Sequence, residues 1–264
     1  MRAVVMRVEG SYSVNINLQY PRIGFIPSPS TIAGAYVHAG MTVLGNMSGK
    51  LINAIKGAYI VFGEDTLLTV NTIMNRGYIR AKGKDKFVSD TNLTTKIVDT
   101  KNLYAVVLLG DVNIGDDQLT IIGENIPTFG WNDSMVWVRE VFVENVKRAR
   151  SEYVNSYVRA VDSDVKRMVE EMIPFISLKL KEDVVIRTSP IYEKTGMKIE
   201  DYITPVVAVG SSENAVLMTA NAGAGKVFVK DHNVLSVGDF LIPRTENIKT
   251  VFSGSNKNSK TGKG

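Results

Sequence analysis

Strand-like and helix-like hydrophobic patterns follow one another in a fixed order over the first 146 residues. A strand alternates apolar and polar side chains, whereas a helix places its apolar residues three or four positions apart. Strand patterns cover residues 2–10, 57–90, 102–111 and 134–146, and helix patterns cover residues 30–44 and 116–126. The resulting order, β-α-β-β-α-β, is that of a ferredoxin-like unit. We therefore predict an α+β fold with this unit at residues 1–150.

Two details of this unit are open to test. Hairpin-like sequence at about residues 64–98 is expected to be an insertion that projects from the sheet. In the last strand, simple alternation predicts that successive side chains lie on opposite faces of the sheet. One face would carry Met135, Trp137, Arg139 and Val141, and the other would carry Val136, Val138 and Glu140.

The rest of the chain divides into a helix, a small β-rich region and a tail. Between residues 154 and 172, valines and methionines step by three and four positions up to Pro174, which predicts an amphipathic helix. β-Branched runs as far as residue 252 predict a small second sheet. Residues 253–264 are rich in Gly, Ser, Asn and Lys, and we expect them to be disordered. The expected divisions are thus 1–150, 151–252 and 253–264.

The helix pattern at 30–44 follows a proline-rich arm. Pro27 and Pro29 fix their own φ angles and push the residues before them toward extended geometry. Ser30 is then expected to cap the helix. A helix start offers unpaired backbone amides to an anion such as phosphate. A plain proline-rich loop with an ordinary cap is the alternative.

Composition excludes several classes of site. The chain of 264 residues has no Cys and only two His, so disulfides, thiolate metal sites and a histidine-built zinc site are not expected. The GAGK run at 223–226 lacks the earlier glycine, the following Ser or Thr and the helix of a nucleotide-binding loop. No apolar run approaches the roughly 20 residues of a membrane span. We expect a cytoplasmic protein with no cofactor, no metal and no membrane contact.

The net charge of +4 is carried mainly by two segments. Residues 76–86 hold five cations and one acid, and the tail adds three lysines. Every second residue of the first segment is a cation or a tyrosine, so up to a turn near Gly83 they would share one face of a strand: Arg76, Tyr78, Arg80, Lys82, Lys84 and Lys86. An aromatic ring on such a face can stack on a base while its neighbours hold phosphates. The pattern favours a polyanionic partner, and a solvated charge run is the alternative.

Two motifs in this order resemble the Cas-five family of CRISPR-associated RAMP proteins. The first is a proline-serine segment that opens a helix of small residues, with Pro27, Pro29, Ser30, Thr31 and Gly34. The second, about 100 residues later, matches at Gly130, Asp133, Ser134, Met135 and Val136. Trp131 departs from the family, in which a basic residue is common at that position. The motifs frame residues 1–146, and the archaeal type I-A branch is one candidate within the family.

The resemblance implies a ferredoxin-like RAMP domain, similar to an RNA-recognition fold, with an inserted β-hairpin thumb. It implies a subunit of a class 1 CRISPR effector complex (Cascade) in antiviral defence, which holds the 5′ handle of the guide RNA (crRNA) and contacts the backbone and large subunits. Residues 64–98 would be the thumb, and the start of the 30–44 helix would belong to the palm. The expected RNA-binding residues are Arg22, Ser30, Thr31, Arg76, Tyr78, Arg80, Lys82, Lys84, Trp131 and Asn132.

Two other functions stay open. One branch of the family cuts precursor RNA with a Tyr, Lys and His set, which we cannot place in this sequence, so we assign no catalytic residue. His38 is the candidate if the protein is instead a metal-independent endoribonuclease. The second alternative is the related RAMP subunit of a type III complex.

Overall fold

The structure is a computed structural model of the chain, and it describes most of the first 164 residues together with the strands that follow. The described residues are 1–15, 26–75, 78–80, 87–89, 93–129, 135–164, 167, 185–193, 196–203, 206–210, 214–219, 226–244 and 247. The expected tail at 253–264 lies outside them.

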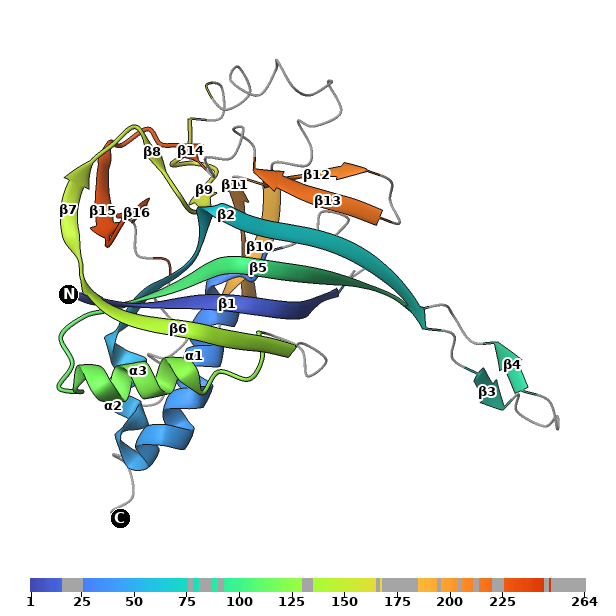
Figure 1. Ribbon diagram of the computed structural model, residues 1–264, viewed down its shortest axis with the longest axis horizontal. Coiled ribbons are helices and arrows are strands. Elements are labelled where there is room, and N and C mark those ends of the chain that lie inside the picture. The colour runs from blue at the N-terminus through green and yellow to red at the C-terminus, as the bar shows by residue number, and fades with distance from the viewer. Residues whose placement is uncertain are drawn as a thin grey trace, which may run out of the picture.

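One antiparallel sheet of six strands forms the centre of the molecule (Figure 1). Its order is β12-β13-β2-β5-β1-β6, and every neighbouring pair is antiparallel. The strands are β1 (Arg2–Asn15), β2 (Ile55–Asn75), β5 (Leu93–Leu109), β6 (Met135–Asn145), β12 (Val206–Gly210) and β13 (Asn214–Thr219). The helical connection from β1 to β2 leaves a place that β5 fills, and the connection from β5 to β6 crosses β1. This split arrangement confirms the ferredoxin-like unit and the α+β fold.

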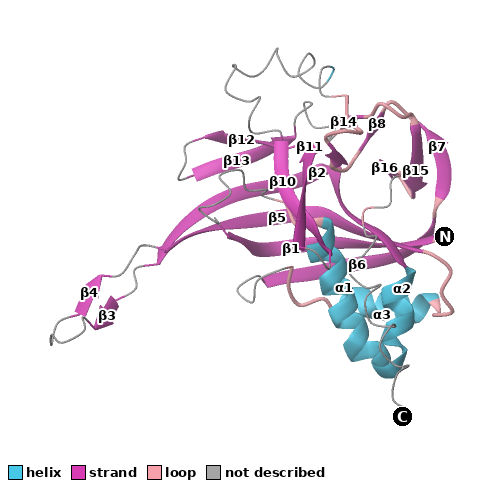
Figure 2. Ribbon diagram, turned by 180° about the vertical axis from the view of Figure 1, so that it is seen from behind, coloured by secondary structure: helices cyan, strands magenta, loops and turns pink. Residues whose placement is uncertain are grey.

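Three helices cover one face of the sheet, as both ribbon views show (Figure 2). They are α1 (Pro29–Leu44), α2 (Ser48–Ala54) and α3 (Asp116–Glu124), with a short 3₁₀ turn, η1 (Gly45–Met47), between the first two. The apolar side of α1 is buried at Ile32, Tyr36 and Ala39 as its spacing predicts. Close packing of α1 on α2 depends on Gly40, because a Cβ there would come within 2.3 Å of the Leu51 side chain.

The N-cap of α1 is Ser28, so the assignment of Ser30 as the cap is wrong. Ser28 is extended, and its hydroxyl accepts a hydrogen bond from the Thr31 amide at 3.3 Å. Pro29 occupies the first helical position, where its missing N–H costs nothing and its fixed φ suits the helix. The residue before that proline is therefore the one left to cap.

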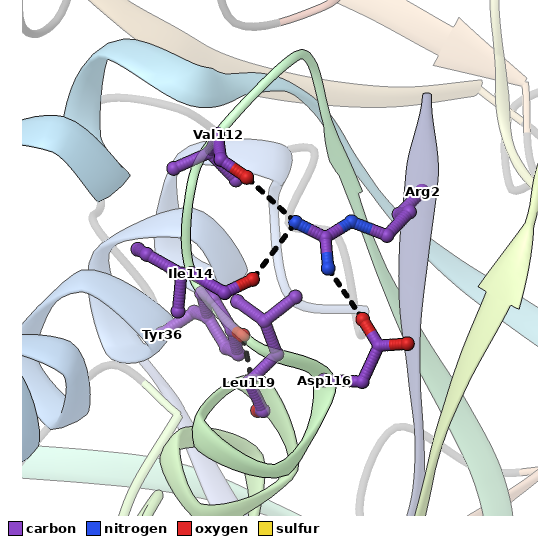
Figure 3. A network of polar contacts seen from close by, with 6 residues as sticks. All are labelled: Arg2, Tyr36, Val112, Ile114, Asp116 and Leu119. Carbon is purple, nitrogen blue, oxygen red and sulfur yellow. Dashed lines mark hydrogen bonds and ion pairs between the residues drawn. The ribbon is translucent and has the colours of Figure 1, made fainter.

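A half-buried arginine ties the start of β1 to the loop before α3 (Figure 3). The Arg2 guanidinium donates to the carbonyl oxygens of Val112 at 2.8 Å and Ile114 at 3.0 Å, and it also pairs with Asp116. Beside it, the Tyr36 hydroxyl donates to the Leu119 carbonyl at 3.1 Å. These contacts hold α1 and α3 to the same end of the sheet.

Strand β6 carries a β-bulge that changes which side chains share a face. Arg7 of β1 pairs with Glu140, and the next residue, Val8, pairs with Val138, so Arg139 is the extra residue. Alternation through Arg139 is therefore wrong for Val141. The bulge returns Val141 to the helix side, where its methyl groups fill the space beside Gly123 of α3.

Strands β2 and β5 form one long hairpin, and only its last few residues extend beyond the strands that flank it, because β1 pairs with β5 as far as Thr95 and β13 pairs with β2 as far as Asn71. The β2–β5 ladder runs from Ile55 paired with Leu109 to Asn75 paired with Leu93, with a register shift between Phe62 and Leu67. Short strands β3 (Tyr78–Arg80) and β4 (Phe87–Ser89) pair with each other beyond its end (Figure 1). The described ends of the expected insertion at 64–98 belong to two central strands, β2 and β5, which stay in the sheet as far as Asn71 and Thr95.

The segment expected to be a helix from residue 154 forms strands, so that prediction is wrong. Strand β8 (Tyr153–Val154) pairs with β14 (Val227–Phe228), and β9 (Val158–Arg159) pairs with β11 (Gly196–Ile203). Val154 and Val158 are buried in a small second core with Phe228. β-Branched valines suit strands at least as well as helices, and pairing with distant segments decides between the two. Residues 165–166 and 168–172 lie outside the described residues.

The C-terminal region is rich in strands, but the expectation of one small second sheet is wrong for β12 and β13, which join the main sheet; the remaining strands form small separate sheets. They are β7 (Lys147–Arg150), β10 (Val185–Glu193), β15 (Asn233–Val237) and β16 (Phe240–Pro243). Strand β7 follows β6 almost directly and joins a small sheet of order β16-β15-β7 on the side of the main sheet away from the helices (Figures 1 and 2). Tyr157, Leu235 and Ile242 from this region are buried in the main hydrophobic core.

Candidate nucleic-acid interface

The structure describes four of the ten residues expected to bind RNA. Ser30 and Thr31 lie in the first turn of α1. The backbone of Tyr78 and Arg80 forms β3 near the end of the long hairpin. The other six lie outside the described residues: Arg22, Arg76, Lys82, Lys84, Trp131 and Asn132.

The start of α1 is a tight hydroxyl cluster. The Ser28 hydroxyl lies 2.9 Å from the Ser30 hydroxyl and 3.0 Å from the Thr31 hydroxyl. The Thr31 amide donates to the Ser28 hydroxyl, and the Ile32 amide donates to the Ser28 carbonyl at 3.1 Å. Since Pro29 has no N–H, these internal bonds use most of the first-turn donors that an anion would need.

The sheet face opposite the helices is the second surface of interest, and we call it the helix-free face. On β6 it carries the exposed residues Met135, Trp137, Arg139, Glu140, Phe142 and Glu144, whereas the helix-side residues Val136, Val138, Val141 and Val143 are buried or half-buried. This division follows from alternation with one bulge. Trp137 was not among the residues predicted from the sequence, although it lies six positions after Trp131, which was.

Trp137 lies over a glycine of the neighbouring strand. A Cβ on Gly10 would come within 2.9 and 3.1 Å of two atoms of the indole, and within 2.4 Å of the Met135 carbonyl oxygen. Gly10 also has a φ of 126°, which L side chains rarely adopt. The glycine therefore permits both the local backbone and the close seat of the indole, which is still 56% exposed.

Charged groups on this face are paired with each other. Arg139 donates to the Glu9 carboxylate at 2.8 Å, and Arg7 pairs with Glu140 at 3.0 Å. Next to them, the Asn102 amide donates to the Asp65 carboxylate at 2.6 Å. Each ion pair is neutral as a whole, and Asp65 adds one carboxylate beside the second pair.

Tyr104 links this face to the C-terminal sheet. Its ring packs against Phe240 of β16 with centroids 4.8 Å apart. Partial burial, followed by the Asp65 carboxylate, raises the pKa of the Tyr104 hydroxyl above its ordinary value. The hydroxyl is therefore protonated at neutral pH and is available as a hydrogen-bond donor.

Strand β7 is a further basic element that sequence reasoning passed over. Lys147, Arg148 and Arg150 are exposed on this edge of the small sheet. Among the described residues, none of the three makes an ion pair. Three cations in four residues was the available signal.

No candidate metal or catalytic cluster stands out in the part of the chain that the structure describes. Within it, no group of three or more His, Cys, Asp and Glu side chains could hold a metal ion. His38 is exposed on α1, in the helix layer rather than on the helix-free face. Within the same residues, none of the helices has the length and apolar character to cross a membrane.

Comparison with known proteins gives a similarity in structure but none in sequence. No family model matches the sequence, and no curated protein matches it. Among solved structures, the crystal structure of a CRISPR protein from Archaeoglobus fulgidus aligns with 91% of this chain and 98% of its own, at 13% sequence identity and a TM-score of 0.44.

Proposed function

We propose that the protein is a non-catalytic RNA-binding subunit of a class 1 CRISPR effector complex, where it holds the 5′ handle of the guide RNA and contacts the backbone and large subunits. The family resemblance at Pro27–Thr31 and at 130–136 is the reason for proposing this complex and this RNA. The chain's own geometry supplies a reason for the binding mode.

The observation that carries the proposal is the reach of the β2–β5 hairpin. From Phe62, in the core, to Asn75, β2 runs beside the β5 residues from Leu103 to Leu93, which span about 33 Å at roughly 3.3 Å per residue. The basic sequence of residues 76–86 follows at its far end. A ribbon of this length with cations at its tip can close over a strand of RNA that lies against the sheet, because the phosphates attract the tip.

The experiment measures binding of a labelled RNA with a repeat-derived 5′ end, by fluorescence anisotropy in EDTA over a series of KCl concentrations. The hairpin variant combines Arg80→Gln, Lys82→Gln and Lys84→Gln. For single strands, each lost phosphate contact lowers the slope of log K against log salt by about 0.7. We expect weaker binding and a slope lowered by about 1 to 2.

A matched control removes three cations at the other end of β2 and beyond it: Lys50→Gln, Lys56→Gln and Arg244→Gln. This variant has the same net charge as the hairpin variant, so a long-range effect of charge would change both equally. Unchanged affinity and slope in the hairpin variant, or equal changes in both variants, would refute the role of the hairpin.

A further inference from the structure

Trp137 lies on the edge strand β6, level with the middle of the β2–β5 hairpin. In the strand register, Glu9 pairs with Trp137, and the following Gly10 pairs with Thr100 of β5. Thr100 in turn pairs with Leu68 of β2, so Trp137 lies level with the middle of the β2–β5 hairpin, where that hairpin is still part of the sheet. An RNA strand held under the hairpin would therefore pass close to this indole.

The seat of the indole makes it a fixed and open aromatic surface. One side of the ring packs on the backbone at Gly10, where no side chain intervenes. More than half of the residue remains exposed. Such a ring needs little reordering to receive a second flat group on its outer side, and exposed aromatic rings bind bases of any sequence in this way.

The neighbouring charges favour an uncharged partner at this point. Arg139 and Glu9 form one ion pair beside the ring, and Arg7 and Glu140 form the next. A phosphate would gain little from a neutral pair. A base edge could accept from a guanidinium or donate to a carboxylate, which is how side chains distinguish bases.

The same charges disfavour a protein partner. Phe142, the next large apolar residue of the helix-free face on β6, is separated from Trp137 by Arg139 and Glu140. The centre of a protein interface is contiguous and depleted of charge. The exposed apolar surface at this point is limited to Trp137 and Met135 and ends at the ion pairs, which is small for the centre of a protein interface.

We infer that Trp137 stacks on one unpaired nucleobase of the bound RNA and that the Arg139–Glu9 pair contacts the edge of that base. This inference rests on the proposed function, and it adds a contact that contributes affinity without contributing to the salt dependence. The hairpin would then attract the phosphates, and the helix-free face would contact the base.

Tryptophan fluorescence can test the contact directly because the chain has only two tryptophans. In the Trp131→Phe variant, all tryptophan emission comes from Trp137, and we expect a single-stranded RNA with the repeat-derived 5′ end to quench it on binding. In the Trp137→Phe variant, emission comes from Trp131 alone, so quenching at that position is measured separately from quenching at Trp137. The same RNA annealed to its complement should bind without quenching Trp137.

Affinity gives the second readout. Trp137→Leu keeps an apolar side chain but loses the ring, and we expect it to weaken RNA binding roughly 5- to 150-fold with an unchanged salt slope. Trp137→Phe should lose less. Phe142→Leu, on the same strand and face, should bind as the unchanged protein does.

The outcomes separate the two proposals. If RNA binds tightly but Trp137 emission and the affinity of Trp137→Leu do not change, the stacking inference is overturned and the proposed function stands. If Trp137→Leu loses association with partner subunits while its RNA affinity is normal, the ring contacts protein and the inference is also overturned. If no variant binds RNA at all, the proposed function itself fails.

Discussion

A buried asparagine near the C-terminus makes a sharp prediction about how the two parts of the molecule are held together. The Asn247 side chain accepts from the Ala58 amide at 2.9 Å and donates to the Ala58 carbonyl at 2.8 Å. Tyr157 donates to the same carbonyl at 3.2 Å. The Asn247 side chain thus satisfies the backbone N–H and carbonyl of Ala58, as a neighbouring strand would.

The magnitude follows from which groups lose their partners. In Asn247→Ala, the buried Ala58 N–H loses its acceptor, which costs about 1–3 kcal/mol, whereas the carbonyl keeps Tyr157. In Tyr157→Phe, the carbonyl keeps Asn247, and we expect a loss of about 1 kcal/mol. In the double variant the carbonyl loses both donors, so the total should exceed the sum of the single losses by about 1 kcal/mol.

Urea unfolding followed by circular dichroism measures these free energies of unfolding. The control is Asn53→Ala, at an exposed position on α2, which should change stability by less than about 0.5 kcal/mol. A loss in Asn247→Ala no larger than that of the control would refute the reasoning. Strict additivity in the double variant would show that the two donors do not share one carbonyl.

Two further predictions concern the helix side of the sheet. Arg2→Met should lower the free energy of unfolding by about 2–3 kcal/mol, because the Val112 and Ile114 carbonyls lose a charged donor; a loss within error in a urea titration would contradict this. Burial raises the pKa of Tyr12 and Tyr36 in the folded protein. Their contribution to the free energy of unfolding is therefore complete below the ordinary pKa of about 10 and is lost as pH rises above that value. Melting temperatures should therefore fall above pH 10, and less steeply in Tyr36→Phe; equal slopes would contradict the assignment.

The first half of the fold was predictable because its signals are local. The apolar spacing at Ile32, Tyr36 and Ala39 defines α1, and the mostly apolar run at 103–109 defines the central strand β5. Their order leaves few arrangements other than a split sheet. The pairing of β13 with β2 joins residues about 150 positions apart, and no local pattern reports it.

The errors share a physical cause, which is that distant partners decided between local alternatives. Val154 and Val158 fit a helix by spacing, but the second core and the pairing with β11 and β14 make them strand residues. The bulge at Arg139 is defined by the pairing of β6 with β1, so alternation within β6 alone could not reveal it. Only the cap at Ser28 had a local signal, the proline at the next position.

The site was predicted only in outline. The sequence indicates cations at 76–86 and a helix start at Ser30, and both were chosen for their attraction to phosphate. The candidate contact at Trp137 depends on Gly10, which is distant in the sequence and adjacent in the sheet. Neither residue is distinctive alone, so a contact of this kind becomes visible only when the two strands are paired.

The central claim, that this protein holds a guide RNA without cutting it, is tested most directly by incubating the pure protein with labelled repeat-containing RNA in EDTA. Denaturing and native gels then report cleavage and binding from the same sample. We expect the RNA to be retained intact in a complex that salt weakens. Specific cleavage that His38→Ala abolishes, or no retention at low salt, would contradict the account.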